Sequence, residues 1–150
     1  MKKIAGLYLI VLLLLAGCAG LQPDGHQAVM ADTERSIESA VLAKSTSSWN
    51  GSILPAYPQG QPEISVLRIE IPPGTSLPLH KHPVINAGFM VKGELTVRTE
   101  GGAVLHLREG EAIVEVVDTW HSGRNEGKVP AEIVVFYAGT ENTPITIYRK

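Results

Sequence analysis

From Trp49 onward, the chain consists of short runs in which apolar and polar residues alternate. In one such run, Leu67 and Ile69 have the same parity and the charged Arg68 stands between them. Side chains two residues apart in a strand lie on the same face of a sheet, so each run predicts a strand that buries one face. The comparable runs are ELTVRT from Glu94, VLHLRE from Val104, AIVEVV from Ala112, EIVVFYA from Glu132 and ITIYR from Ile145.

Turn-forming residues separate these runs at intervals of roughly 8 to 12 residues, which is typical of β-sandwiches and β-barrels. No stretch after residue 48 has a convincing helical period, and there is no internal repeat. A chain of 150 residues is expected to hold one domain. We therefore predict a single all-β domain over residues 48–150. The turn signals are Pro72-Pro73-Gly74, Lys92-Gly93, Gly101-Gly102, Glu109-Gly110 and Asn125-Glu126-Gly127.

Residues 1–17 have the composition of a secretory signal peptide. Lys2 and Lys3 precede an apolar run from Ile4 to Leu15, which is shorter than the ~20 residues that span a bilayer. The sequence LAGC, which ends at Cys18, resembles the lipobox of bacterial lipoproteins. This resemblance implies cleavage before Cys18 and acylation of its thiol by chains such as palmitate. The alternative is an ordinary signal peptide followed by an incidental cysteine.

Residues 18–47 are predicted to form a lipid-anchored tether, because they include few large apolar side chains. When fully extended, such a segment would reach on the order of 100 Å. Ala19, a non-acidic residue, follows Cys18, and by resemblance to lipoprotein sorting rules this favours the outer membrane over the inner membrane. The expected location is therefore the bacterial cell envelope.

The formal net charge of the whole chain is −2, and removing the two lysines of the signal peptide lowers it to −4. The sequence contains no basic patch. Proteins that bind nucleic acid need such a patch to contact phosphates, so nucleic acid is not an expected partner.

Three histidines form the most informative constellation in the chain. His80 and His82 would lie on the same face of a strand, and Asn86 would join them if that strand continued past Pro83. His121 ends another apolar run. Three imidazoles from two adjacent strands would form a site for a divalent Fe, Mn, Ni, Cu or Zn ion. The alternative is that the H-x-H pair is only the polar face of a strand.

The stretch from Gly74 to Gly93 resembles the first motif of the cupin superfamily, G-x5-H-x-H-x3-E-x6-G. Both glycines and both histidines stand at the required spacing, and Asn86 occupies the position of the glutamate. The resemblance implies a small cupin β-barrel, a double-stranded β-helix with jelly-roll-like strand order. It also implies that His80, His82, Asn86 and His121 form the metal site.

The stretch GEAIVEVVDTWHSGRN resembles the second cupin motif, G-x5-P-x-G-x2-H-x3-N. Gly110, His121 and Asn125 match, whereas Val116 replaces the proline and Asp118 replaces the glycine. Together the two motifs extend the resemblance over roughly residues 62–140. Asp118 is a mild departure, because aspartate is among the few residues that tolerate a positive φ.

Asn86 is the departure with chemical consequences. A glutamate ligand would cancel one of the two charges of the metal, whereas the neutral amide leaves the site at +2. An amide oxygen still binds metals, but it donates less, and an amide is not a general base. The remaining charge would favour a small anionic ligand.

Other polar residues have two interpretations each. Trp120 and Arg124, on either side of His121, are candidates for ligand binding, but they equally fit packing and a surface ion pair. Glu115 shares parity with His121 and fits either a position beside the metal or the opposite face. His106 stands between Leu105 and Leu107, so we expect it outside the barrel.

The resemblance does not select one function, because cupins include dioxygenases, isomerases, decarboxylases, binding modules and storage proteins. The leading hypothesis is a metal site that binds a small, anionic molecule, with oxygenase- or isomerase-type turnover. The rival is a non-catalytic binding or sensing module at the membrane surface. A third hypothesis, a structural protein without metal, is disfavoured by the intact histidine spacing. Small cupins often form homodimers, and the sequence leaves this open.

Overall fold

The structure is a computed structural model that describes residues 36–150. Contacts within the chain divide it into residues 1–37 and residues 38–150, and the second unit is described here. The predicted signal peptide, the predicted acylation at Cys18 and residues 18–35 of the predicted tether lie outside the described residues. Between residues 36 and 150, there is no helix of the length and apolar character needed to cross a membrane.

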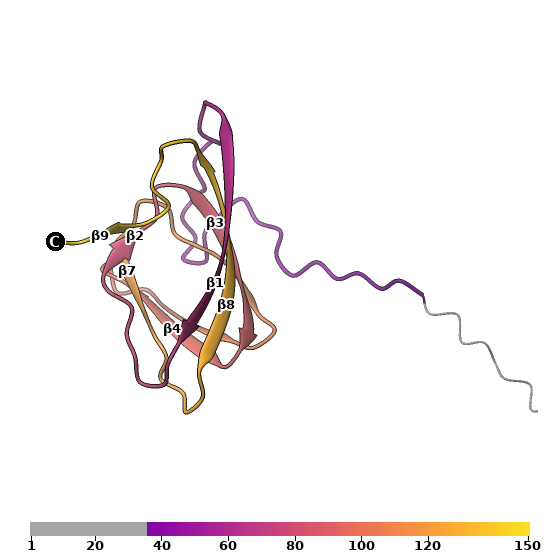
Figure 1. Cartoon of the computed structure of the whole chain (residues 1–150), viewed down its shortest axis with the longest axis vertical. Coiled ribbons are helices and arrows are strands. Elements are labelled where there is room, and N and C mark those ends of the chain that lie inside the picture. The colour runs from indigo at the N-terminus through magenta and orange to yellow at the C-terminus, as the bar shows by residue number, and fades with distance from the viewer. Residues whose placement is uncertain (1–35) are drawn as a thin grey trace, which may run out of the picture. The chain divides into compact units, whose positions relative to one another are not determined.

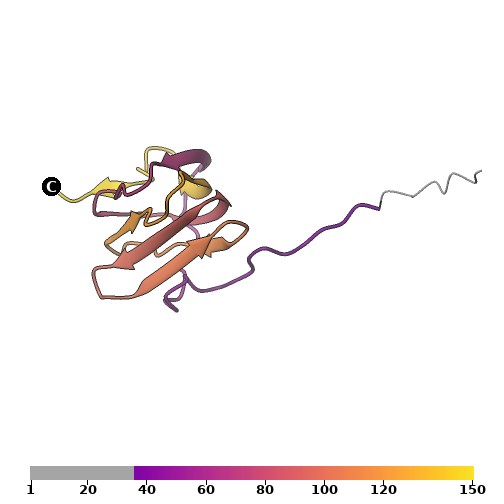
Figure 2. The same cartoon turned by 90° about the horizontal axis from the view of Figure 1, so that it is seen from below.

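Residues 38–150 contain nine strands in two sheets and no helix, which confirms the predicted all-β class (Figures 1 and 2). Every pair of neighbouring strands is antiparallel. One sheet has the order β1 (Pro62–Ile71), β8 (Ala131–Thr140), β3 (Ile85–Lys92), β6 (Ala112–Val114). The other has the order β5 (Val104–Arg108), β4 (Glu94–Thr99), β7 (His121–Arg124), β2 (His80–Lys81), β9 (Ile147–Tyr148).

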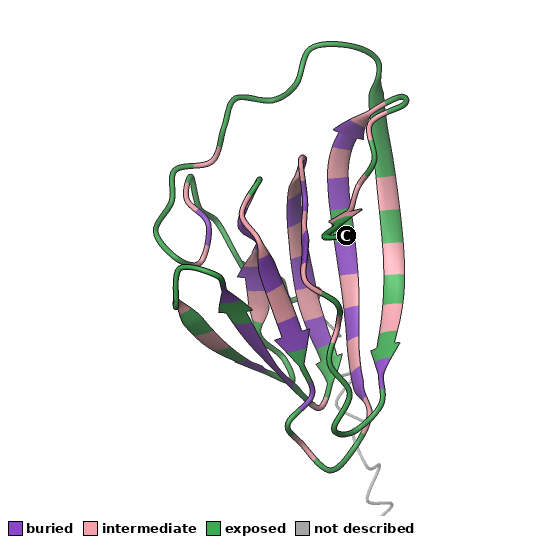
Figure 3. Cartoon of the chain, turned by 90° about the vertical axis from the view of Figure 1, so that its left-hand side faces the viewer, coloured by how far each residue is buried: buried purple, intermediate pink, exposed green. Residues whose placement is uncertain are grey.

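Alternate burial along the strands builds the core between the two sheets, as the banding in Figure 3 shows. On β1, Ile71 is buried and Arg68 is exposed, as the alternation predicted. The pairing of β1 with β8 runs for ten residues, from Pro62↔Thr140 to Ile71↔Ala131. Each fully buried aliphatic side chain stabilises the fold by about 1.5–3 kcal/mol. The buried core residues are Ile71, Val84, Met90, Leu95, Val97, Leu107, Ile113, Ala131, Ile133, Val135 and Tyr137.

The strand that carries His80 does not continue past Pro83. The condition on which Asn86 was predicted to lie on the same strand as the two histidines is therefore not met. Strand β2 ends at Lys81, and β3 begins at Ile85 in the other sheet. Proline has no N–H to donate to a ladder, so a strand interior does not accommodate it. Asn86 therefore reaches the barrel interior from the four-stranded sheet, while His80 reaches it from the five-stranded sheet.

An N-terminal segment, residues 46–54, covers the free edge of β6. Ser47 pairs with Ile53 across a turn, and the N–H of Trp49 donates to the carbonyl of Val114 at 2.9 Å. The Trp49 side chain packs against the core. An uncovered strand edge exposes unpaired backbone groups, and this turn satisfies one of them. The segment thus covers the edge with a turn and forms no additional strand in the sheet.

Candidate metal centre

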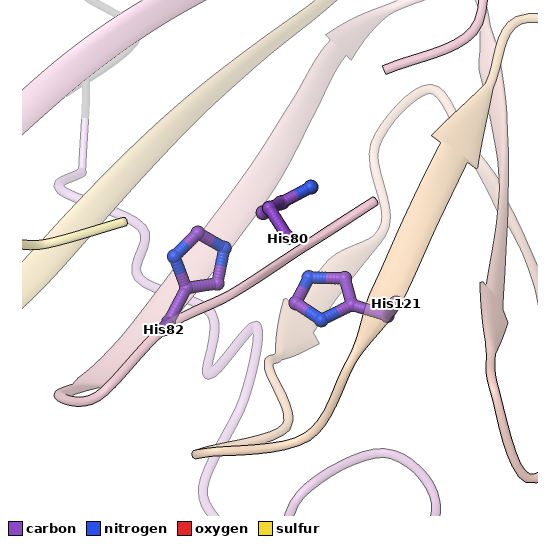
Figure 4. A group of neighbouring side chains, drawn as sticks. All are labelled: His80, His82 and His121. Carbon is purple, nitrogen blue, oxygen red and sulfur yellow. The ribbon is translucent and has the colours of Figure 1, made fainter. Parts of the chain in front are cut away.

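Two neighbouring strands bring the three histidines together. His80 on β2 is directly opposite His121 on β7, and side chains paired in this way lie on the same face. His82 follows β2 and forms an isolated bridge with Val117. The ring centroids lie 4.4 to 5.1 Å apart, and one nitrogen of each ring lies within 4.8 Å of the others. Figure 4 shows the three rings gathered around a common space.

Each histidine contacts a backbone carbonyl through Nδ1. A carbonyl oxygen only accepts hydrogen bonds, so each Nδ1 carries the proton and each Nε2 keeps a free lone pair. This tautomer is the one in which Nε2 binds metals, and the second hydrogen bond fixes the orientation of the ring. The three contacts are His80 to Pro78 at 2.6 Å, His82 to Ile145 at 2.8 Å and His121 to Thr119 at 2.8 Å.

Burial lowers the pKa of all three histidines, because it penalises the charged imidazolium. For His82 the pKa falls to about 4, and the positive charges that His80 and His121 would carry contribute to the shift. The carbonyl acceptors oppose this effect but do not outweigh it. At neutral pH the three rings are therefore uncharged, which is the state required of metal ligands.

A cavity of about 270 Å³ lies beside the histidines. Its wall is mostly apolar, and none of the described residues that line it is a lysine or an arginine. Such a cavity suits a small molecule with an apolar part and one polar group. The lining residues are Leu67, Ile69, Leu77, Pro78, His80, His82, Asn86, Leu95, Glu115, Ile133, Val135, Tyr137, Thr146 and Tyr148.

Two acceptor oxygens that line the cavity have no hydrogen-bond partner among the described residues: Oδ1 of Asn86 and Oε2 of Glu115. Both side chains are buried, and the amide nitrogen of Asn86 donates to Val84 at 3.3 Å. Glu115 Oε2 lies 3.8 Å from Nε2 of His121. Buried acceptors are normally satisfied, so this pair fits a cation in the site. The three Nε2 atoms, whose lone pairs the Nδ1 contacts leave available, fit a divalent transition metal.

Residues 67–137 match a family described as "Cupin domain". The chain contains a cupin domain. This agrees with the double-sheet barrel and with the motif resemblance seen in the sequence.

Two solved structures of DMSP lyases give the same fold, and an oxalate oxidase is also among the structures that are similar to this chain. The DMSP lyase DddQ from Ruegeria pomeroyi DSS-3 is 22% identical with a TM-score of 0.50, over 57% of this chain and 42% of that chain. A structure of the DMSP lyases RdDddP and RnDddQII is 16% identical with a TM-score of 0.51, over 58% and 44%. An oxalate oxidase in complex with the substrate analogue glycolate is 29% identical with a TM-score of 0.48, over 57% and 45%.

The present chain spans less than half the length of these three structures. No curated protein matches it. The likeness at these identities concerns the fold of the cupin domain, so the chemistry has to be argued from the site itself.

The cupin domain places the other candidate residues outside the cavity lining. Trp120 lies between two cations, with Lys81 Nζ 5.6 Å and the Arg149 guanidinium 4.5 Å from its ring centroid. Arg124 is exposed and donates to the Ser76 hydroxyl at 2.9 Å. Neither side chain is among those that line the cavity.

Two expectations, for His106 and Asp118, are confirmed, and the structure adds the role of Asn125. His106 is exposed on the outer face of β5. Asp118, at the glycine position of the second motif, has φ +50°. Asn125, the last residue of that motif, is fully buried, and its amide nitrogen donates to the carbonyls of Ile71 and Val129. Asn125 therefore joins the end of β1 to the loop at Val129 and is not among the residues that line the cavity.

Two cavity residues were not selected from the sequence. The sequence left open which face of the sheet the Glu115 side chain occupies. In the structure β6 ends at Val114, so the alternation along the strand does not decide the direction of the next side chain. Tyr137 fits the alternation of β8 and looks like any other core aromatic in sequence. In the structure, the ring centroids of Tyr137 and His82 are 5.3 Å apart, and burial raises the pKa of Tyr137 to about 12. No sequence signal distinguishes it from a packing residue.

Proposed function

We propose that the chain binds one divalent transition metal through Nε2 of His80, His82 and His121. The observation that carries this proposal is the set of three Nδ1 contacts to carbonyls, which leaves three convergent lone pairs. The unpaired Oδ1 of Asn86 supports its assignment as a fourth, neutral ligand. The donor set of imidazoles with an oxygen suits Fe, Mn, Ni, Cu or Zn.

The cavity would hold a small molecule whose apolar part contacts Leu67, Ile133 and their neighbours. Because no lysine or arginine is among the described lining residues, a carboxylate or other anion would find its positive partner at the metal. A metal in this position supplies Lewis-acid polarisation of the bound group. We propose oxygenase- or isomerase-type turnover on such a molecule, and the rival reading is a binding or sensing module.

We further propose that acylation of Cys18 anchors the domain to the bacterial envelope, in the outer membrane. The support is the LAGC sequence, since Cys18 is the only cysteine in the chain. Two or more acyl chains give stable anchoring. Cys18→Ser should move the protein from the membrane fraction to the aqueous fraction, and an unchanged distribution would refute the anchor.

The first experiment measures the metal content of the purified full chain by mass spectrometry, without a histidine tag. We expect a stoichiometric transition metal in the wild type and in His106→Ala, whose histidine is exposed. We expect its loss in His82→Ala and in His121→Ala. Equal metal content in all four proteins would refute the proposed site.

The second experiment separates turnover from simple binding. The metal-loaded protein is incubated in air with small carboxylates, and oxygen uptake, product formation and ligand binding are recorded together. Product that depends on His82 supports turnover. Saturable binding with neither oxygen uptake nor product supports the binding module.

A further inference from the structure

Glu115 and Asn86 are neighbours across two strands. In the pairing of β3 with β6, Ala87 is opposite Val114, and the next pair would be Asn86 with Glu115. The N–H of Glu115 donates to the carbonyl of Asn86 at 3.1 Å, so the two chains still run side by side at this point. Side chains opposite each other in an antiparallel pair lie on the same face. A carboxylate therefore stands next to the amide that occupies the glutamate position of the first motif.

The backbone of Glu115 is fixed from both sides. On one side it is bonded to Asn86, and on the other its carbonyl accepts a hydrogen bond from the Ser48 hydroxyl at 2.8 Å. The preceding residue, Val114, accepts from Trp49 at 2.9 Å. This double support fixes the backbone of Glu115, and its side chain, which is 12% exposed, lines the cavity.

The distance from Glu115 to one of the histidines, His121, is compatible with a shared ion. A transition metal lies about 2.0–2.2 Å from imidazole nitrogens and carboxylate oxygens, so two ligand atoms up to about 4 Å apart can share one ion. Oε2 of Glu115 and Nε2 of His121 are 3.8 Å apart. The same oxygen has no hydrogen-bond partner among the described residues and is free to coordinate.

The charge of a bound metal ion is the second reason to expect Glu115 as a ligand. Three neutral imidazoles and a neutral amide would leave a divalent ion at +2 in a buried site, and an uncompensated buried charge is costly. The carboxylate of Glu115 would reduce that charge to +1. The other acidic residues of the described chain do not line the cavity.

We propose that Glu115, which directly follows β6 and lies beside Asn86 of β3, supplies the anionic ligand of the metal centre. This inference rests on the proposed metal site. It makes the site a three-histidine, one-carboxylate centre in which the carboxylate comes from the second motif. Asn86 then remains a neutral ligand beside it.

The test is a titration of the chelator-treated full chain with Zn²⁺ alone at pH 8, followed by competition with a chromophoric chelator. We expect Glu115→Gln to bind Zn²⁺ roughly 30-fold or more weakly than the wild type, since even outer partners of a metal ligand contribute 10–100-fold. Glu109→Gln, which removes an exposed carboxylate, should bind within about threefold of the wild type.

A double variant guards against a folding artefact. Adding Asn86→Glu to Glu115→Gln returns a carboxylate to the neighbouring strand and should restore most of the lost affinity. If Glu115→Gln and the wild type bind equally while His82→Ala does not bind, the role of Glu115 is refuted and the histidine site stands. If the wild type itself does not bind Zn²⁺, both the site and the role of Glu115 are refuted.

Discussion

A carboxyl group that folding buries makes the free energy of unfolding depend on pH. In Glu115, burial raises the pKa from 4.5 to about 7, although the backbone N–H of Val116, the nearby His80 and the indole N–H of Trp49 favour the charged form. Nε2 of His121 also lies 3.8 Å from the carboxylate, and the negative charge of Glu115 contributes to the raised pKa of Tyr137. A raised carboxyl pKa means that stability is fully present below pH 4.5 and is lost as pH rises toward 7.

The magnitude follows from the shift. A change from 4.5 to about 7 corresponds to roughly 3 kcal/mol of stability that the metal-free protein loses between acidic pH and pH 8. Glu115→Gln has a similar volume and no charge, so it avoids this loss. The histidines are present in both proteins, so they contribute to the difference only through their coupling to the charge of Glu115, as at His80.

The assay is urea unfolding of both proteins at 25 °C in the presence of a chelator, at pH values from 5 to 8. We expect a stability gap below about 1 kcal/mol at pH 5 and a gap of roughly 3 kcal/mol at pH 8, with the glutamine variant more stable. Glu109→Gln should show no such slope. A gap between wild type and Glu115→Gln that does not change with pH would refute the assignment of a buried, titrating carboxyl.

Zinc should narrow that gap. When Zn²⁺ is added at pH 8, the wild type should gain more stability than Glu115→Gln, because a ligand that binds only the folded state stabilises it by an amount that rises with the logarithm of its affinity, and a roughly 30-fold difference in affinity corresponds to about 2 kcal/mol. An equal gain in both proteins would contradict a carboxylate ligand.

Three further measurements test the fold and the site. Because the pKa of His82 is lowered to about 4, the metal-free protein should lose stability as pH falls from 6.5, and urea midpoints should show less of this loss in His82→Gln. At Gly93 (φ +76°) an added Cβ would meet a backbone carbonyl oxygen at 2.8 Å, whereas at Gly102 (φ +88°) it would meet nothing. Gly102→Ala should therefore cost about 1–2 kcal/mol and Gly93→Ala clearly more, as measured by thermal unfolding. Asn125→Ala removes three hydrogen bonds to backbone groups, one of them fully buried at Ile71, and should cost about 3 kcal/mol in the same assay.

The sequence predicted those parts of the fold that depend on local alternation. The period of two on β1 and β5 placed Leu67 and Leu107 inside and His106 outside, because strand geometry alone decides these directions. The histidines were found for a similar reason, since motif spacing placed His80 and His121 on adjacent strands. Their Nδ1 contacts were not predictable, because the carbonyl acceptors of Pro78 and Ile145 depend on loop conformation.

The position of Glu115 was not predictable from alternation. Its direction depends on pairing with Asn86 beyond the end of β6 and on the bond from Ser48, 67 residues earlier in the chain. Such contacts between distant segments leave no local period in the sequence. The transfer of Asn86 to the other sheet was missed for a related reason, since Pro83 ends one strand but does not specify where the next one pairs.

The hydrogen bonds of Ser48 and Trp49 also decide how a pulling force on the N-terminal side would enter the barrel. They fasten the chain, where it enters the barrel, to the carbonyls of Val114 and Glu115. A pull along the N-terminal side would reach the turn of residues 46–54 and these two bonds before it reached the long pairing of β1 with β8. The end of the barrel that bears Glu115 would therefore take tension before β1 and β8 do, and stretching would disturb the cavity before it separated those two strands.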